Sequence, residues 1–304
     1  MLDADRLLDR QRLKRQLTGW RVGAIVAGVV ALAALVAPAG RGRLGATHIA
    51  RVNVSGIITE NQKLVDAVGA LAKDRSVPAV IVSIDSPGGS VAGGESLRAV
   101  LIRLAAAKPV VAVMHGTAAS AGYMIALPAA RIFARDATLT GSIGVILETG
   151  EASGLLAKFG LSATAITSGP LKDQPSFTRP LTPQGHEYLN ALVADMYDQF
   201  VTMVADARHM DKAAVQTLAD GRAYTGRQAQ KLGLVDEIGG EIEARSWLAR
   251  ERGVAESVPS EDLKMGTLYE RTVGASLSGF WTSAWSGLQP SAGPVALWTG
   301  GSAR

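Results

Sequence analysis

Short apolar runs alternate with stretches of helical periodicity along most of the chain. Continuous apolar runs rich in Val and Ile are typical of strands that are covered on both faces of a sheet. By this criterion we predict strands at residues 48–58, 79–85, 109–114, 142–147 and 161–167. Apolar positions at helical spacing predict helices at 62–73, 91–107, 182–207, 211–218, 226–232 and 241–251. This alternation predicts an α/β domain with a mainly parallel sheet flanked by helices.

An uncharged apolar segment at residues 22–40 precedes this domain. As a helix it would span roughly 28 Å, close to the thickness of the hydrocarbon core of a bilayer. Six basic residues precede the segment, and Arg41, Arg43 and Arg51 follow it. This asymmetry predicts one transmembrane anchor at an inner (cytoplasmic) membrane, with a cytoplasmic N-terminus and an extracytoplasmic domain. A cleaved signal peptide is the alternative, because Ala-Pro-Ala at 37–39 is similar to a cleavage site.

These patterns divide the chain into five parts. We predict a basic tail at 1–21, the anchor at 22–40, a linker at 41–47, the folded domain at 48–254 and a flexible tail at 255–304. The last part loses its periodicity and, over 274–304, is rich in Gly, Ser, Ala and Trp. Segments of that composition bury too little apolar surface to fold alone.

Charge and cysteine content exclude several functions. Residues 1–21 carry six basic and three acidic groups, and so contribute +3 of the net charge of +4. The folded domain therefore has no basic patch for nucleic acid. The chain has no cysteine, which excludes disulfides, thiolate metal sites and a cysteine nucleophile. The four histidines lack metal-ligand spacing, and we expect no cofactor or metal.

Three clusters could carry chemistry. DSPGGS at 85–90 follows a predicted strand, and its glycines could bring bare N–H groups close to a ligand or simply form a tight turn. GTAASAGY at 116–123 places Ser120 at a helix N-terminus, where N–H groups favour an oxyanion but where serine is also a common N-cap. GPLKD at 169–173 places Lys172 in a loop, and a lone loop lysine is usually a solvated charge.

Taken together, the clusters resemble the signal peptide peptidase family of serine proteases (the SppA type), relatives of the Clp protease subunit and the crotonases. The matching motifs are DSPGGS, AASAGY at 118–123, TGSIGV at 140–145, and KD at 172–173 with Arg179 shortly after. The resemblance covers roughly residues 48–250 and implies a Clp protease/crotonase-like fold. One departure is Ala121-Gly122, where the family usually has Gly-Gly after the serine.

The resemblance implies a role for each matched residue. Ser120 is the nucleophile, Lys172 the general base, and Ser142 orients the lysine amine. The backbone N–H groups of Gly89 and Ala121 form the oxyanion hole. The family builds its sites across neighbouring protomers, so we expect a homo-oligomer. The expected activity is that of a membrane-anchored serine endopeptidase that cleaves signal peptides or hydrophobic membrane-derived peptides. The residues around the site predict cleavage after small or aliphatic residues, because they are themselves small and apolar: Val91, Ala92, Gly93, Ala118, Ala119, Ile143 and Val145.

A lysine that acts as a base must be neutral. With a pKa near 10.4, roughly one lysine in 2,500 is neutral at pH 7, so the pKa has to be lowered by about 2–3. An apolar, water-poor pocket can supply this change. A carboxylate beside the amine would oppose it, so we expect Asp173 to point toward a basic or backbone partner instead.

Three alternatives stay open. A Ser-His-Asp peptidase of the Clp type requires a histidine about two dozen residues after the serine, but residues 135–155 contain none, and His115 precedes Ser120. A crotonase-like enzyme would act on acyl-CoA, a cytoplasmic substrate, which does not suit an outward-facing domain. A non-catalytic membrane scaffold would not need Ser120, Ser142 and Lys172 together.

Overall fold

The computed structural model describes residues 20–21, 23–28 and 47–264. The chain divides into two units, residues 1–46 and 47–304, and each is described by itself. In the first unit, residues 20–21 and 23–28 are helical and exposed, and the predicted anchor at 22–40 lies mostly outside the described residues. Within the described ranges, no helix is both long and apolar enough to cross a bilayer.

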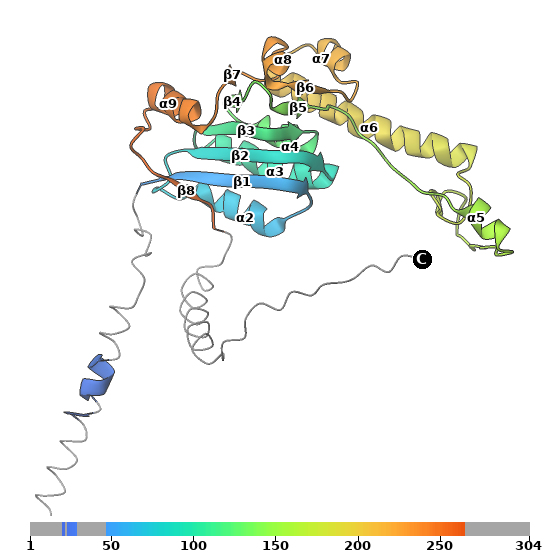
Figure 1. Cartoon of the computed structure of the whole chain (residues 1–304), viewed down its shortest axis with the longest axis horizontal. Helices are drawn as coiled ribbons and strands as arrows, with labels where there is room; N and C mark the ends of the chain where they lie inside the picture. Colours follow the sequence, from blue (N-terminus) through green and yellow to red (C-terminus); the bar gives the residue numbers. More distant parts are fainter. Residues whose placement is uncertain (1–19, 22, 29–46, 265–304) are drawn as a thin grey trace, which may run out of the picture. The chain divides into compact units, whose positions relative to one another are not determined.

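The second unit is an α/β domain (Figure 1). Its described strands are β1 Ile49–Ile58, β2 Val80–Gly89, β3 Val110–Ala119, β4 Arg131–Ala134, β5 Leu139–Gly141, β6 Ala223–Thr225, β7 Glu237–Ile238 and β8 Ser260–Asp262. Its described helices are α2 Gln62–Leu71, α3 Val91–Ala105, α4 Ala121–Ala126, α5 Ser153–Lys158, α6 Pro183–Arg208, α7 Lys212–Leu218, α8 Gly226–Lys231 and α9 Glu241–Arg252.

The strands form one mainly parallel sheet, as predicted. Its order is β6-β5-β3-β2-β1-β8, and β4 pairs with both β3 and β7. Among the described strands only β5 and β6 pair antiparallel. The parallel strands bring their carboxyl ends to one edge, where ligand sites of such sheets usually lie.

Helices cover the sheet on both faces. Alternate residues of β2 point to opposite sides, so Val80, Val82 and Ile84 join the large core formed with α2, α3, α4 and α6. Ile81 joins a smaller core on the other face, where Trp247 and other residues of α9 cover it. This two-sided burial explains why the central strands are continuous apolar runs in the sequence.

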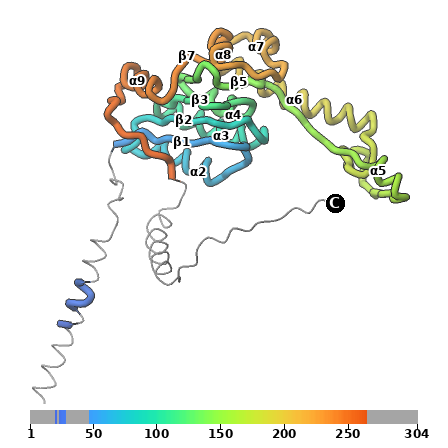
Figure 2. The backbone as a smooth tube through the Cα atoms, viewed as in Figure 1, coloured from blue at the N-terminus to red at the C-terminus, as the bar shows by residue number. Residues whose placement is uncertain are grey.

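An arm leaves the domain between β5 and the second half of α6. Figure 2 follows the chain from β5 out to α5 and back along α6. The C-terminal half of α6 enters the core through Phe200, Val201, Val204 and Ala205, whereas the rest of this helix buries only Gly185 and Leu189. The helix α5 buries no residue. We call the chain from residue 142 to the first half of α6 the arm. It is attached to the rest of the domain mainly at its two ends.

Two predicted strands are wrong because they fall in the arm. Residues 142–147 and 161–167 form no strand. Ile143 alone among the large apolar side chains of these runs is buried, whereas Ile146 is 82% and Ile166 100% exposed. A β-branched run becomes a strand only where a partner completes its hydrogen bonds, and here the chain supplies none.

The sheet also extends past residue 254, where the sequence predicts the domain to end. Residues 260–262 form β8, which pairs parallel with the start of β1. Arg51 of β1 binds Asp262 and Glu241 at 3.0 and 2.6 Å, which ties this added strand and α9 to the sheet. The rest of the predicted tail, 265–304, lies outside the described residues.

The packing around Gly226, at the start of α8, can be tested by substitution. A Cβ on Gly226 would overlap the carbonyl oxygen of Arg135, so Gly226→Ala should lower the free energy of unfolding by about 1–3 kcal/mol. The matched control is Gly154→Ala in α5, where a Cβ meets nothing within 4 Å. We expect that control to change stability by no more than about 1 kcal/mol. Urea unfolding measures both, and equal stabilities would contradict the packing.

Candidate active site

Ser120 occupies a strained backbone position between β3 and α4. Its φ and ψ angles are 53° and −121°, in a region that non-glycine residues rarely adopt. The Ser120 N–H donates to the Gly141 carbonyl at 2.9 Å, and the Ser120 carbonyl accepts from the Met124 N–H at 3.0 Å. A backbone conformation of this kind costs about 1–3 kcal/mol, and residues that adopt one are found mostly at functional sites. The sharp turn places the Ser120 side chain at the carboxyl edge of the sheet.

The side chain of Ser120 does not cap the helix that it precedes. Ser120 stands at the N-cap position of α4 but makes no side-chain capping hydrogen bond. Ser90 provides the contrast, because its Oγ accepts from the Gly93 N–H at 3.1 Å and caps α3. The explanation of Ser120 as an ordinary capping serine is therefore wrong, and its half-buried hydroxyl is left for other chemistry.

The glycine turn at the end of β2 packs directly against Ser120. A Cβ on Gly88 would lie 2.8 Å from the Ser120 Cβ and 3.3 Å from the Ala121 backbone nitrogen. A Cβ on Gly89 would overlap the backbone of Ile58 in β1. Only glycines allow this approach, which brings the backbone of Gly88 close to the Ala121 nitrogen and that of Gly89 close to Ile58. Ala121 begins α4, so its N–H has no acceptor within the helix.

Ser86 holds the glycine turn in place, a role that the sequence did not reveal. Its side chain is fully buried, and its Oγ donates to the Gly56 carbonyl at 2.6 Å. The same oxygen accepts from the Gly88 N–H at 3.0 Å. The DSPGGS motif showed a serine here, but its burial depends on β1, which lies about thirty residues earlier.

Ser142 lies beside Ser120 through the register of β3 and β5. Ala119 pairs with Gly141, so the residues that follow them are Ser120 and Ser142. Ser142 also has a positive φ of 46°, and its N–H donates to the Arg222 carbonyl at 3.0 Å. Its Oγ donates to the Gly221 carbonyl at 3.1 Å, which leaves the oxygen lone pairs free to accept from an amine.

Lys172 belongs to the arm and does not lie beside Ser120 of its own chain. It occupies the segment between α5 and α6, which Figure 1 shows well away from β3 and α4. Its backbone N–H donates to the Gly169 carbonyl at 3.2 Å, whereas its side chain is exposed and makes no hydrogen bond or ion pair within the described ranges. Asp173 forms an ion pair with Arg179. This confirms the expectation that the Asp173 carboxylate points toward a basic partner.

His115 does not complete a catalytic triad with Ser120. Its Nε2 hydrogen-bonds to the Ser83 Oγ at 2.9 Å, across β2 and β3. The Ser120 side chain takes no part in that bond. Among residues 47–264 no group of three or more acidic or histidine side chains could hold a metal ion.

A family model agrees with these motifs. The model described as Peptidase family S49 matches residues 102–255, which include Ser120, Ser142 and Lys172. The chain belongs to peptidase family S49.

Relatives of this S49 peptidase confirm the resemblance to the SppA type. A relative from Synechocystis sp. is 42% identical over 207 residues, which are 68% of this chain and 75% of the relative. Protease 4 of Salmonella typhi is 39% identical, with 55% of this chain and 27% of that protein covered. The chloroplastic serine protease SPPA of Arabidopsis thaliana is 34% identical over 61% of this chain and 27% of its own length.

Two solved structures have more distant similarity to the S49 peptidase. One is a ClpP1 mutant from Listeria monocytogenes, at 18% identity and a TM-score of 0.42, covering 62% of this chain and 91% of that one. The other is a mutant of a membrane-bound stomatin-specific protease, at 16% identity and a TM-score of 0.47, covering 73% and 100%. Similarity at this level carries no argument about the chemistry of the site.

Proposed function

We propose that this S49 peptidase is a serine endopeptidase in which Ser120 of one copy is activated by Lys172 of a neighbouring copy. The observation that carries the proposal is the backbone of Ser120. It is strained, its hydroxyl is not used as a cap, and the glycine turn lies against it. A structural serine would need none of these features. The presence of Lys172 on a projecting arm supports a base supplied by another chain.

The proposed reaction follows from these positions. The Ser120 Oγ attacks the peptide carbonyl while its proton moves to the Lys172 amine. The oxygen of the tetrahedral intermediate takes the negative charge and accepts hydrogen bonds from the N–H groups of Gly89 and Ala121. The C–N bond then breaks, and the protonated lysine gives its proton to the leaving amine. Water repeats the sequence on the acyl-enzyme and frees Ser120.

The surface of the arm supports a second copy as its partner. Large apolar side chains are exposed along it: Ile146, Leu147, Leu155, Phe159, Leu161, Ile166 and Phe177. Soluble proteins rarely leave so many such side chains exposed in one segment, and those that do usually bind another protein there. Burial of the arm against a neighbouring domain would also remove water from Lys172, and a drier site favours the neutral amine that a base requires.

Ser142 suits the role of orienting the lysine. Its hydroxyl proton is directed to the Gly221 carbonyl, so its oxygen can accept a hydrogen bond from an incoming amine. The pairing of Ala119 with Gly141 puts the backbone of Ser142 beside that of Ser120, which supports this role. An amine that binds there would stand within reach of the nucleophile.

The dyad and its division between two copies can be tested together. Ser120→Ala and Lys172→Ala should each abolish peptide cleavage without unfolding, and the double variant should be no worse than either. A site in a mixed oligomer needs an intact serine from one chain and an intact lysine from another. An equal mixture of the two inactive variants, dissociated and reassembled, should therefore recover about a quarter of wild-type turnover.

Lys158→Ala is the matched control, because this lysine is also exposed on the arm. It should keep wild-type turnover. Near-normal activity of Lys172→Ala would contradict the dyad. Inactive single variants whose mixture stays inactive would place both groups in the same chain.

The surface beside the glycine turn favours apolar substrates. Ile57, which pairs with Gly88, is 70% exposed, and Val91 and Ala92, which follow the turn, also reach the surface. Ile143, one of the residues expected around the site, is fully buried and cannot contact a substrate. A charged side chain buried against this surface would lose its hydration without gaining a partner.

We therefore expect cleavage after Ala, Leu and similar residues, and little cleavage after Lys, Arg, Asp or Glu. Mass spectrometry of the products from a mixed peptide set measures this preference, with Ser120→Ala protein as the blank. Dominant cleavage after basic residues would mean that an acidic group faces the substrate, and would overturn the preference.

The charge pattern around residues 22–40 supports a membrane anchor, with residues 1–21 in the cytoplasm and the peptidase domain outside it. The hydrophobic fragments proposed as substrates would gather near such an anchor. A single cysteine at Asp211 should react with an impermeant maleimide on intact spheroplasts, and the native chain has no cysteine to interfere. Labelling that requires a permeabilised membrane would reverse the orientation.

A further inference from the structure

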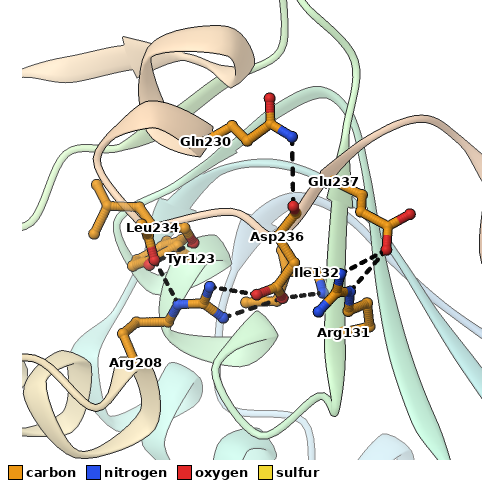
Figure 3. A network of polar contacts seen from close by, with 9 residues as sticks. Tyr123, Arg131, Ile132, Arg208, Gln230, Leu234, Asp236 and Glu237 are labelled. Atoms are coloured by element: carbon orange, nitrogen blue, oxygen red, sulfur yellow. Dashed lines mark hydrogen bonds and ion pairs between the residues drawn. The ribbon is translucent and has the colours of Figure 1, made fainter.

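A buried polar network joins the C-terminal end of α6, the helix along which the chain returns from the arm, to α4, the helix that follows Ser120 (Figure 3). Arg208, the last residue of α6, directs its guanidinium at the segment 233–236 that follows α8. Tyr123 of α4 donates a hydrogen bond to the same segment, at the Leu234 carbonyl. The proposed reaction assigns no role to these residues.

Arg208 is fixed by several hydrogen bonds. Its Nε donates to the Gly233 carbonyl at 2.8 Å. Its two terminal nitrogens donate to the two oxygens of Asp236, at 3.2 and 2.6 Å. Asp236 in turn accepts from the Ile132 N–H of β4 at 2.7 Å. The Arg208 and Asp236 side chains are only 11% and 17% exposed, so the pair holds one geometry.

Tyr123 attaches α4 to this segment. Its ring is fully buried in the main core, and its hydroxyl donates to the Leu234 carbonyl at 2.8 Å. Burial raises the pKa of Tyr123, so the hydroxyl keeps its proton and remains a donor. Because α4 has only six residues and Tyr123 follows Ser120 by three, this bond fixes the rotation of the helix that starts at the nucleophile.

We propose that Tyr123 and Arg208 are positioning residues that fix the nucleophile and the arm to one common anchor, the segment 233–236. The inference rests on the proposed function. In a symmetric oligomer each chain gives a serine to one site and an arm lysine to another, so the angle between α4 and α6 sets the geometry of every site. Residues 183–199 of α6 precede the part that is packed in the core and form about 26 Å of helix, so a rotation of about 5° where the helix enters the core moves its far end by about 2 Å.

A positioning role and a purely structural role differ in what they change. If the network only stabilised the core, its loss would lower the melting temperature and leave the turnover of folded protein intact. If it positions the two groups, its loss lowers kcat in fully folded protein and leaves KM unchanged, because misplaced reacting groups slow the chemical step. Both residues should then act through the same anchor, and their effects should not add.

The experiment compares Tyr123→Phe, Arg208→Gln and their double variant on one peptide substrate. Tyr123→Phe removes one hydroxyl and keeps the ring, so it is the variant that should fold without difficulty. We expect it to lower kcat about tenfold with KM within about twofold of wild type. The kcat of the double variant should be no lower than about that of the less active single variant. Melting temperature and oligomer size are measured in parallel.

Tyr224→Phe is the matched control, since the Tyr224 hydroxyl also donates to a backbone carbonyl, that of Leu218, at 2.9 Å. It should keep kcat within about twofold of wild type, and its effect should add to that of Arg208→Gln. Wild-type kcat for Tyr123→Phe, with Ser120→Ala inactive, would overturn this inference and leave the proposed function standing. Full activity of Ser120→Ala would overturn the proposed function, and this inference with it.

Discussion

The strained turn at Ser120 is the constraint on which the rest of the site depends. A serine at φ 53° is stable only where its surroundings hold it, and three segments do so here. Gly141 accepts its N–H, the glycine turn of β2 packs on its Cβ, and α4 starts from its carbonyl. The first two of these contacts come from β5 and β2, and the third comes from the helix that follows Ser120. The position of Ser120 therefore depends on the order and register of the strands as well as on its neighbours in sequence.

The same sheet accounts for the division of the molecule into a packed domain and an arm. Parallel strands covered on both faces supply most of the buried apolar surface, and the second half of α6 completes that core. The arm beyond it exposes Phe159, Ile166 and other apolar side chains, which water does not stabilise. A chain with this distribution would gain free energy if a second copy covered the arm, and in the proposed reaction that association would also complete the site.

Polar groups inside the domain fix the relative orientation of segments that are distant in sequence. The hydroxyl of Ser86, the guanidinium of Arg208 and the carboxylate of Asp236 all bind backbone atoms of segments distant in sequence. Hydrogen bonds that involve a charged group are short and directional, so they define relative orientation better than apolar packing does. This is the physical basis for regarding the network at the C-terminal end of α6 as part of what positions the site.

The sequence by itself determined the local features. Apolar periodicity indicated the three central strands and the long helix α6, and the spacing of DSPGGS, Ser120, Ser142 and Lys172 indicated the family, because these depend on neighbouring residues or on order along the chain. Only the tertiary structure decided which apolar runs found a partner, so that 142–147 became part of the arm and 260–262 became a strand. It also decided that Ser86 is buried, that Ser120 does not cap its helix and that Lys172 lies away from Ser120. These outcomes depend on contacts between segments distant in sequence, and periodicity carries no information about which segments will meet.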